Sequence, residues 1–174
     1  MQASADFSPV SLFFRLCDLD IPPAASIMDE SISEILLKNT KLEISPETFT
    51  LVSIQKGLWS KLLEDQALSP RGTVPFMILS DKYEVTLLFD EIDFGTIRHA
   101  IRDAKTEGGF RMLTFDTVMD FAVVGFLAEV ARILADAGVS IVALSAFSRD
   151  HLLVKQTDLA AALKALGPFV AELC

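Results

Sequence analysis

The chain has 174 residues, of which 51% are hydrophobic, and its mean hydropathy is +0.43. A chain of this length and composition can bury a sizeable core, as one compact unit or as two small fused ones. Its formal net charge of -9, from 15 basic and 24 acidic residues, argues against nucleic acid or an anionic membrane surface as a partner. The longest apolar runs fall far short of the roughly 20 residues that span a bilayer, so we expect no transmembrane helix.

The two cysteines, Cys17 and Cys174, lie at opposite ends of the chain with no metal-type or redox-type spacing. This usage favours free thiols in a reducing compartment. The first basic residue is Arg15, which interrupts the apolar run that a secretory signal would need. We therefore expect a cytoplasmic protein.

Residues 1–34 show no sustained periodicity, and we expect a flexible N-terminal extension there; a partner-binding or self-docking segment is the alternative. Residues 35–108 alternate strand and helix patterns and are predicted to form a first module. Its expected elements are strands at Ile35–Ile44 and Phe49–Ile54, a short helical or irregular segment at Gly57–Leu63, a hairpin of Pro75–Leu79 with Glu84–Phe89, and a helix at Ile92–Ala104 that Gly108–Gly109 ends.

Residues 109–174 are predicted to form a second module of similar order. A strand at Phe110–Phe115 is followed by an amphipathic helix that begins at Asp120, an N-cap residue, and ends at Gly138. On the solvent face of this helix, Arg132 is spaced to pair with Glu129 and Asp136. The remaining expected elements are strands at Val139–Leu144 and Leu152–Val154 around a turn at Ala146–Asp150, and a helix at Leu159–Leu166 with Thr157 as N-cap and Gly167–Pro168 as stop.

The order β-α-β-β-α occurs twice, which predicts an α+β fold of two ferredoxin-like sandwiches (βαββαβ) in tandem. The second half lacks one edge strand. We expect the N-terminal strand Ile35–Ile44 to cross over and complete the second sheet, because this covers an exposed edge and interlocks the two modules.

Four stretches of the chain resemble the ACT domain superfamily, and within it the CASTOR-type tandem ACT proteins, which include cytosolic arginine sensors and small bacterial proteins. The resemblance implies two ACT modules with a small ligand, most often an amino acid, bound at the interface between modules, and signalling to a protein partner or an attached enzyme. The stretches that resemble the family are Lys56–Trp59, Pro75–Glu91, Leu134–Val139 and Ser145–Leu159.

The residues themselves indicate how an amino acid would be held. A helix N-terminus in the turn Thr117–Phe121 offers N–H groups to a carboxylate, and Asp150 on the following hairpin offers an acid to the ammonium group. Gly125, inside the expected helix, indicates close approach of a ligand or, alternatively, tight packing of the helix on the sheet. The resemblance implies that Phe147 and Asp150 hold the ligand.

The hairpin departs from the pattern of the family, Ser-Thr-aromatic-x-Thr-Asp. Ser145 and the two implied ligand residues fit it, whereas Ala146 and Arg149 replace the threonines, and Arg149 is placed to neutralise Asp150. Glu129 stands where relatives have serine, so the identity of the ligand does not transfer. The candidate ligand-binding residues are Asp120, Phe121, Gly125, Glu129, Val130, Ala146, Phe147 and Asp150.

No other motif predicts a site. His99 and His151 have no partners at metal-ligand spacing, and Asp90–Asp93 is expected to be a solvated acidic turn. Trp59 is expected in the core, with a platform for a ligand as the alternative. We find no paired nucleophile and base, and expect neither an enzyme nor a bound cofactor or metal. The sequence favours a protein that senses an amino-acid-like ligand, with a ligand-free interaction module or homodimer as the alternative.

Overall fold

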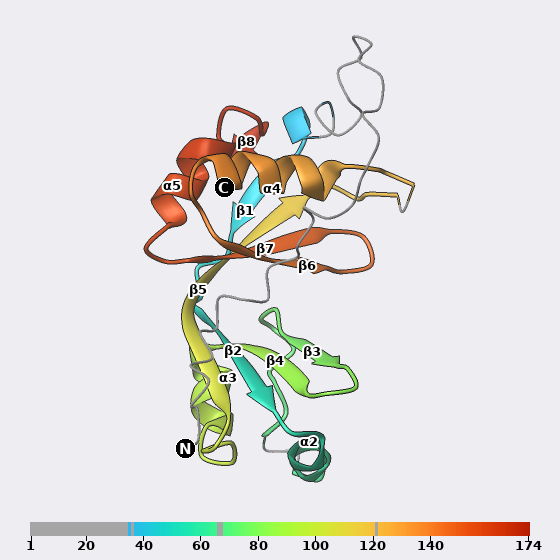
Figure 1. Ribbon diagram of the computed structural model, residues 1–174, viewed down its shortest axis with the longest axis vertical. Helices are drawn as coiled ribbons and strands as arrows, with labels where there is room; N and C mark the ends of the chain where they lie inside the picture. Colours follow the sequence, from blue (N-terminus) through green and yellow to red (C-terminus); the bar gives the residue numbers. More distant parts are fainter. Residues whose placement is uncertain (1–34, 36, 66–67, 121) are drawn as a thin grey trace, which may run out of the picture.

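The structure is a computed structural model that describes residues 35, 37–65, 68–120 and 122–174 (Figure 1). The extension expected over residues 1–34 lies outside the described residues, as does Cys17 within it. No described helix has the length and apolar character needed to cross a bilayer. The elements follow in the order β1 (Lys41–Ile44), β2 (Phe49–Ile54), α2 (Lys56–Leu62), β3 (Met77–Ser80), β4 (Val85–Asp90), α3 (Glu91–Ile97), β5 (Lys105–Asp116), α4 (Phe126–Asp136), β6 (Ile141–Ser145), β7 (Asp150–Lys155), α5 (Leu159–Leu166) and β8 (Glu172–Leu173).

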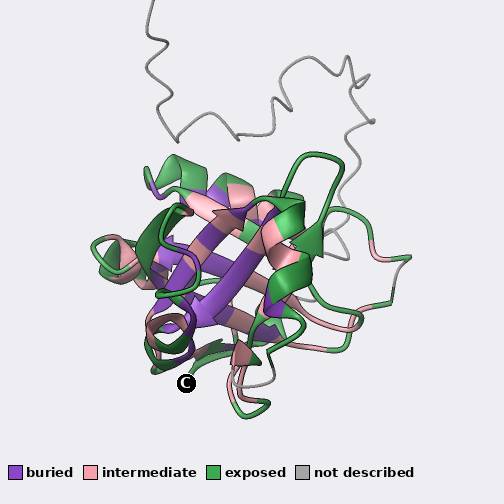
Figure 2. Ribbon diagram, turned by 90° about the horizontal axis from the view of Figure 1, so that it is seen from below, coloured by how far each residue is buried: buried purple, intermediate pink, exposed green. Residues whose placement is uncertain are grey.

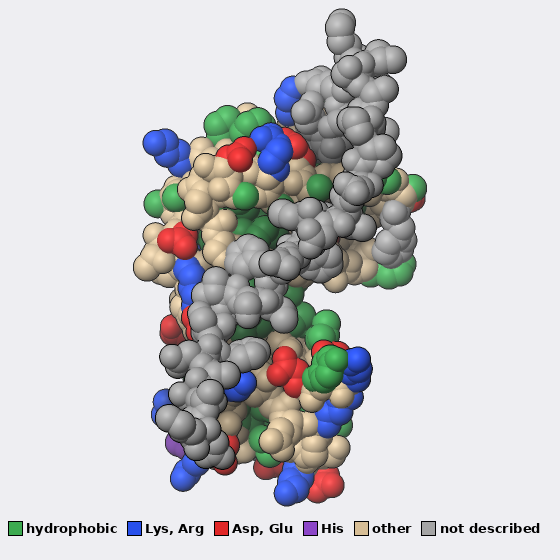
Figure 3. All heavy atoms as spheres, in the orientation of Figure 1, with side chains coloured by type: hydrophobic (Ala, Val, Ile, Leu, Met, Phe, Trp, Pro, Cys, Tyr) green, Lys and Arg blue, Asp and Glu red, His purple; other side chains and the backbone are tan. Residues whose placement is uncertain are grey.

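The long strand β5 joins the two halves of the fold. Its first part pairs with β2, which continues through β4 to the edge strand β3, and its second part pairs with β7 on one side and β1 on the other. Figure 1 shows α4 and α5 over the half-sheet built on the end of β5, and α2 and α3 at the opposite end of the molecule. In the space-filling view, the molecule has two lobes with a hollow between them on one side (Figure 3).

The predicted strand crossover is confirmed over four residues. β1 runs antiparallel to the end of β5, from Lys41 opposite Asp116 to Ile44 opposite Leu113. The strand is shorter than the predicted Ile35–Ile44. It does not form the sheet edge either, because β8 pairs with its outer side in parallel.

Three apolar clusters follow from the alternation of side chains along the strands. On β7, Leu152 and Val154 face α4 and α5, whereas Leu153 points to the opposite face. On β4, Leu87 faces the helices of the first half and Leu88 points away from them. Figure 2 shows the buried strands enclosed by helices with exposed outer faces. Side chains from both halves meet in a middle cluster of Phe49, Leu88, Phe110, Met112 and Leu153.

The helix predicted over Ile92–Ala104 is wrong at its C-terminal end. α3 stops at Ile97, and the glycines expected to end it lie inside β5. There, Gly109 has a φ of 74°, and a Cβ on Gly108 would approach Thr50 Oγ1 to 3.1 Å. The glycines therefore accommodate the register shift between β2 and β5.

The prediction of a solvated acidic turn at Asp90–Asp93 is also wrong. Asp90 is 3% exposed and caps α3 by accepting the Asp93 N–H at 2.9 Å, and Asp93 is itself 7% exposed. Arg71 pairs with both carboxylates; its Nε lies 2.7 Å from Asp93 Oδ1. These contacts raise the pKa of the Arg71 guanidinium above its ordinary value, with hydrogen bonds to Asp90 and then Asp93 as the main causes. The turn is a buried ion-pair cluster that fixes the loop before β3 to α3.

Candidate functional site

The loop between β5 and α4 differs from its prediction. Asp120 does not cap α4, because the helix begins at Phe126 with Gly125 as N-cap. Instead, Asp120 Oδ1 accepts the N–H of Ala122 at 2.8 Å and its carbonyl accepts that of Val123 at 3.0 Å, which closes a turn inside the loop. Gly125 is likewise not in the helix interior; its φ of 91° is a left-handed conformation that glycine adopts readily.

No described side chain caps the N-terminus of α4. The first intrahelical hydrogen bond runs from the Glu129 N–H to the Gly125 carbonyl at 2.9 Å, so the N–H groups of Phe126, Leu127 and Ala128 precede it. These groups lie at the positive end of the helix dipole. The arrangement suits a carboxylate without requiring a basic side chain.

The hairpin between β6 and β7 lies against this loop. The Met119 N–H donates to the Ser148 carbonyl at 3.1 Å, and Arg149 Nε lies 2.9 Å from Asp116 Oδ1 at the end of β5. The turn is closed by the Ala146 N–H, which donates to the Arg149 carbonyl at 2.9 Å. The structure thus brings together the two segments that the sequence singled out.

Arg149 pairs with Asp116 and not with Asp150 among the described residues, contrary to the expectation that it neutralises Asp150. Asp150 is half-buried at the start of β7, where its Oδ1 accepts the hydroxyl of Ser145 at 2.6 Å. Next to it, His151 Nδ1 lies 2.9 Å from Thr114 Oγ1. Burial lowers the pKa of His151, although the nearby Asp150 carboxylate opposes this effect.

Apolar side chains are exposed on both segments. Phe147 at the hairpin tip is 84% exposed, and Val118 and Val124 in the loop are 70% and 85% exposed. The exposed aromatic on the hairpin and the two exposed valines on the loop that contacts it offer a surface for the apolar part of a ligand or partner.

Two of the predicted site residues have other roles. Val130 is fully buried in the core between α4 and the sheet, so it packs the helix against the sheet and is not available to a ligand. Glu129 accepts hydrogen bonds from Arg132, which lower the pKa of its carboxyl, and it lines a separate cavity of about 200 Å³ with Leu37, Lys38 and Phe169. Phe121 lies outside the described residues.

The sequence analysis missed the residues that fasten the loop to the hairpin. Asp116, Met119 and Ser148 make these contacts, and no periodicity or motif links them because they are about thirty residues apart in the sequence. The pairing of Ser145 with Asp150 was visible in principle, because both lie at the ends of one short turn. Across the described ranges, no three His, Cys, Asp or Glu side chains are grouped so that they could hold a metal ion.

Comparison with known proteins matches residues 105–167, from β5 through α5, to the family model of the ACT domain. No curated protein sequence matches the chain. Solved structures of similar fold include a protein from Agrobacterium tumefaciens (19% identity, TM-score 0.59, covering 78% of this chain and 92% of that one) and a protein of unknown function from Vibrio cholerae, described as a possible transport protein (20%, 0.58, 78% and 94%).

The regulatory subunit of aspartate kinase from Thermus thermophilus is another structure of similar fold, with 14% identity and a TM-score of 0.56 over 76% of this chain and 98% of that subunit. Whole aspartate kinases are also similar, but this chain covers only 34% of the Clostridium acetobutylicum enzyme. The chain therefore has the mixed α+β fold of aspartate kinase regulatory subunits, and its segment from β5 through α5 matches the ACT domain.

Proposed function

We propose that the chain is a non-catalytic tandem ACT protein of the CASTOR type, with modules at residues 35–108 and 109–174, that binds an amino-acid-like ligand in the cytoplasm and regulates a partner. The ACT match over residues 105–167 and the fold shared with regulatory subunits of aspartate kinase support this proposal. It does not depend on a boundary within β5, since that strand serves both halves.

The observation that most supports the proposal is the uncapped N-terminus of α4, which follows the loop that is hydrogen-bonded to the hairpin bearing Asp150. The N–H groups of residues 126–128 suit the carboxylate of an amino acid, and the Asp150 carboxylate suits its ammonium group. The Met119–Ser148 hydrogen bond holds the two segments together. In this proposal Phe147 and the exposed valines contact the side chain of the ligand.

A calorimetric titration of the protein with each of the common amino acids tests the proposal. We expect at least one to bind saturably, and Asp150→Asn to weaken that binding about tenfold or more, because the loss of a charge-assisted contact to ammonium is of this size. Asp136→Asn, at the C-terminal end of α4, is the matched control and is expected to bind the amino acid with the affinity of the wild-type protein. Absence of any binder at millimolar concentration would refute the proposal.

The edge strand β3 favours a second candidate, a ligand-free interaction module. Four large apolar side chains are exposed on or beside it: Phe76 is 44% exposed, Ile78 40%, Leu79 52% and Tyr83 76%. An exposed apolar edge strand is a template for pairing with another chain. Light scattering after gel filtration distinguishes the candidates: an oligomer that ignores every amino acid and is dissociated by Leu79→Lys would favour the interaction module.

A further inference from the structure

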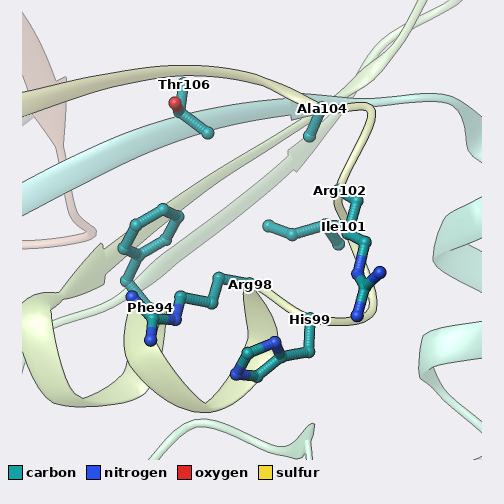
Figure 4. Close-up of a pocket in the computed structure, with 7 residues that line it drawn as sticks. All are labelled: Phe94, Arg98, His99, Ile101, Arg102, Ala104 and Thr106. Atoms are coloured by element: carbon teal, nitrogen blue, oxygen red, sulfur yellow. The ribbon is translucent and has the colours of Figure 1, made fainter.

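The first half of the fold contains a second cavity that the proposed amino-acid site does not use. It has a volume of about 330 Å³ and opens beside the C-terminal end of α3 and the start of β5. This volume lies within the range of small-molecule sites. Figure 4 shows the lining side chains arranged around one hollow, with Thr106 and Ala104 across from the end of α3. The lining residues are Phe94, Arg98, His99, Ile101, Arg102, Ala104 and Thr106.

The charge of this cavity is opposite to that of the chain. Two arginines, Arg98 and Arg102, line it, and no aspartate or glutamate does, although the chain as a whole has a net charge of -9. His99 lies between them with a ring nitrogen that can donate a hydrogen bond, and Thr106 adds a hydroxyl. The cavity therefore combines three kinds of donor, on four side chains, with a local positive charge.

The two arginines also differ from the other arginines of the described ranges. Arg71, Arg132 and Arg149 each pair with carboxylates, and Arg111 donates to the Ser45 carbonyl and to Gln156. Arg98 and Arg102 have no side-chain hydrogen bond or ion pair with any described residue. Figure 4 shows their guanidinium groups on opposite sides of the hollow, that of Arg98 beside Phe94 and that of Arg102 beyond His99. In a chain with an excess of acids, two guanidinium groups that border one cavity without a described carboxylate partner leave their donor capacity for a ligand.

We propose that this cavity binds a small phosphate monoester. The exposed side chains of Arg98 and Arg102 hold the phosphate from opposite sides of the hollow, and an apolar or aromatic portion lies against Phe94 and Ile101. A guanidinium group binds phosphate oxygens through two parallel hydrogen bonds, and two such groups match the two negative charges of a monoester better than the single charge of a carboxylate. Burial of the apolar portion of the ligand against these side chains adds to the binding free energy. This site is independent of the proposed amino-acid site.

Calorimetry with phenyl phosphate, benzoate and benzyl alcohol tests the proposal, because these probes share one ring and differ in charge. We expect phenyl phosphate to bind saturably, benzoate more weakly, and benzyl alcohol not at all. Arg98→Gln and Arg102→Gln are each expected to weaken phenyl phosphate about tenfold or more. Lys61→Gln, which removes one positive charge from α2 outside the cavity, is the matched control and is expected to leave the affinity unchanged.

The proposal is overturned if phenyl phosphate shows no saturable binding up to about 10 mM, if benzoate binds as tightly, or if the arginine variants bind like Lys61→Gln. Both arginines are exposed, and circular dichroism of each variant verifies that it is folded. A purely structural role, in which the arginines only stabilise the end of α3, predicts lower thermal stability without any effect of phenyl phosphate. Asp150→Asn should leave phenyl phosphate binding unchanged, so failure at one site is distinguishable from failure at the other.

Discussion

The middle cluster predicts that the two halves unfold as one unit, and the adjacent leucines of β7 allow a controlled test. Leu152 and Leu153 are both fully buried, but Leu152 packs in the core under α4 and α5, whereas Leu153 belongs to the cluster shared with Leu88 of the first half. Leu153→Ala and Leu152→Ala remove the same atoms from sites of equal burial. Leu152→Ala is therefore the matched control, because its loss of packing lies within the core of the second half.

We expect each substitution to lower the free energy of unfolding by about 3 to 4 kcal/mol, the usual cost of a fully buried leucine with the cavity left behind. With a urea dependence of about 2 to 3 kcal/mol per M, the midpoint falls by about 1 to 2 M. Trp59, the single tryptophan, packs against the core of the first half and reports on that half alone.

Urea titrations followed by tryptophan fluorescence and by far-ultraviolet circular dichroism provide the measurement. If the middle cluster couples the halves, the fluorescence midpoint in Leu153→Ala falls together with the dichroism midpoint, as expected of a cooperative unit. A fluorescence midpoint that stays at the original value would refute the coupling. A cost below about 1 kcal/mol for Leu153→Ala would show that its site is not a closed core.

Three further results are expected. Gly125→Ala and Gly138→Ala should each cost about 1 kcal/mol in urea unfolding, because both glycines have positive φ, but only Gly125→Ala should weaken amino-acid binding; equal effects on binding would contradict the site. Arg71→Ala leaves two buried carboxylates without their cation, so it should lower the melting temperature more than Arg132→Ala, whose partners are on the surface of α4. Equal losses of melting temperature would contradict the role of the buried ion-pair cluster. Burial lowers the pKa of His151, so the unfolded chain binds a proton on this residue more readily than the folded chain does. The free energy of unfolding should therefore fall as the pH drops below the ordinary pKa of 6.5, and His151→Asn should reduce the difference between urea titrations at pH 7 and pH 5. An unchanged difference would contradict the contribution of His151.

The sequence predicted the second half well where local physics decides the structure. The periodicity through Val130 and Leu134 gave the buried face of α4, Arg132 pairs with both predicted carboxylates, and Gly138 has the expected positive φ of 73°. α5 has the predicted bounds, although its N-cap is Asp158. The order of the elements also indicated that a strand from the first half was needed to complete the second sheet, as β1 does by pairing with β5.

The errors share one cause, which is a partner distant in the sequence. Asp120 and Gly125 are both acceptable helix starts locally, and the chain between them stays in a loop that Met119 fastens to Ser148. The acids at the start of α3 are buried because Arg71 lies against them, about twenty residues upstream. The strand β8 was missed because it has two residues and forms only by pairing with β1. Local patterns contain no information on such partners.

Backbone amide shifts measured by nuclear magnetic resonance test the central claim most directly. The protein, labelled with nitrogen-15, is titrated with each amino acid. The account predicts saturable shifts of the Phe126, Leu127 and Ala128 amides together with that of Asp150, which mark an amino acid bound between the N-terminus of α4 and the hairpin. Spectra in which no amino acid moves these amides, or in which the shifts are confined to the edge strand β3, would contradict it.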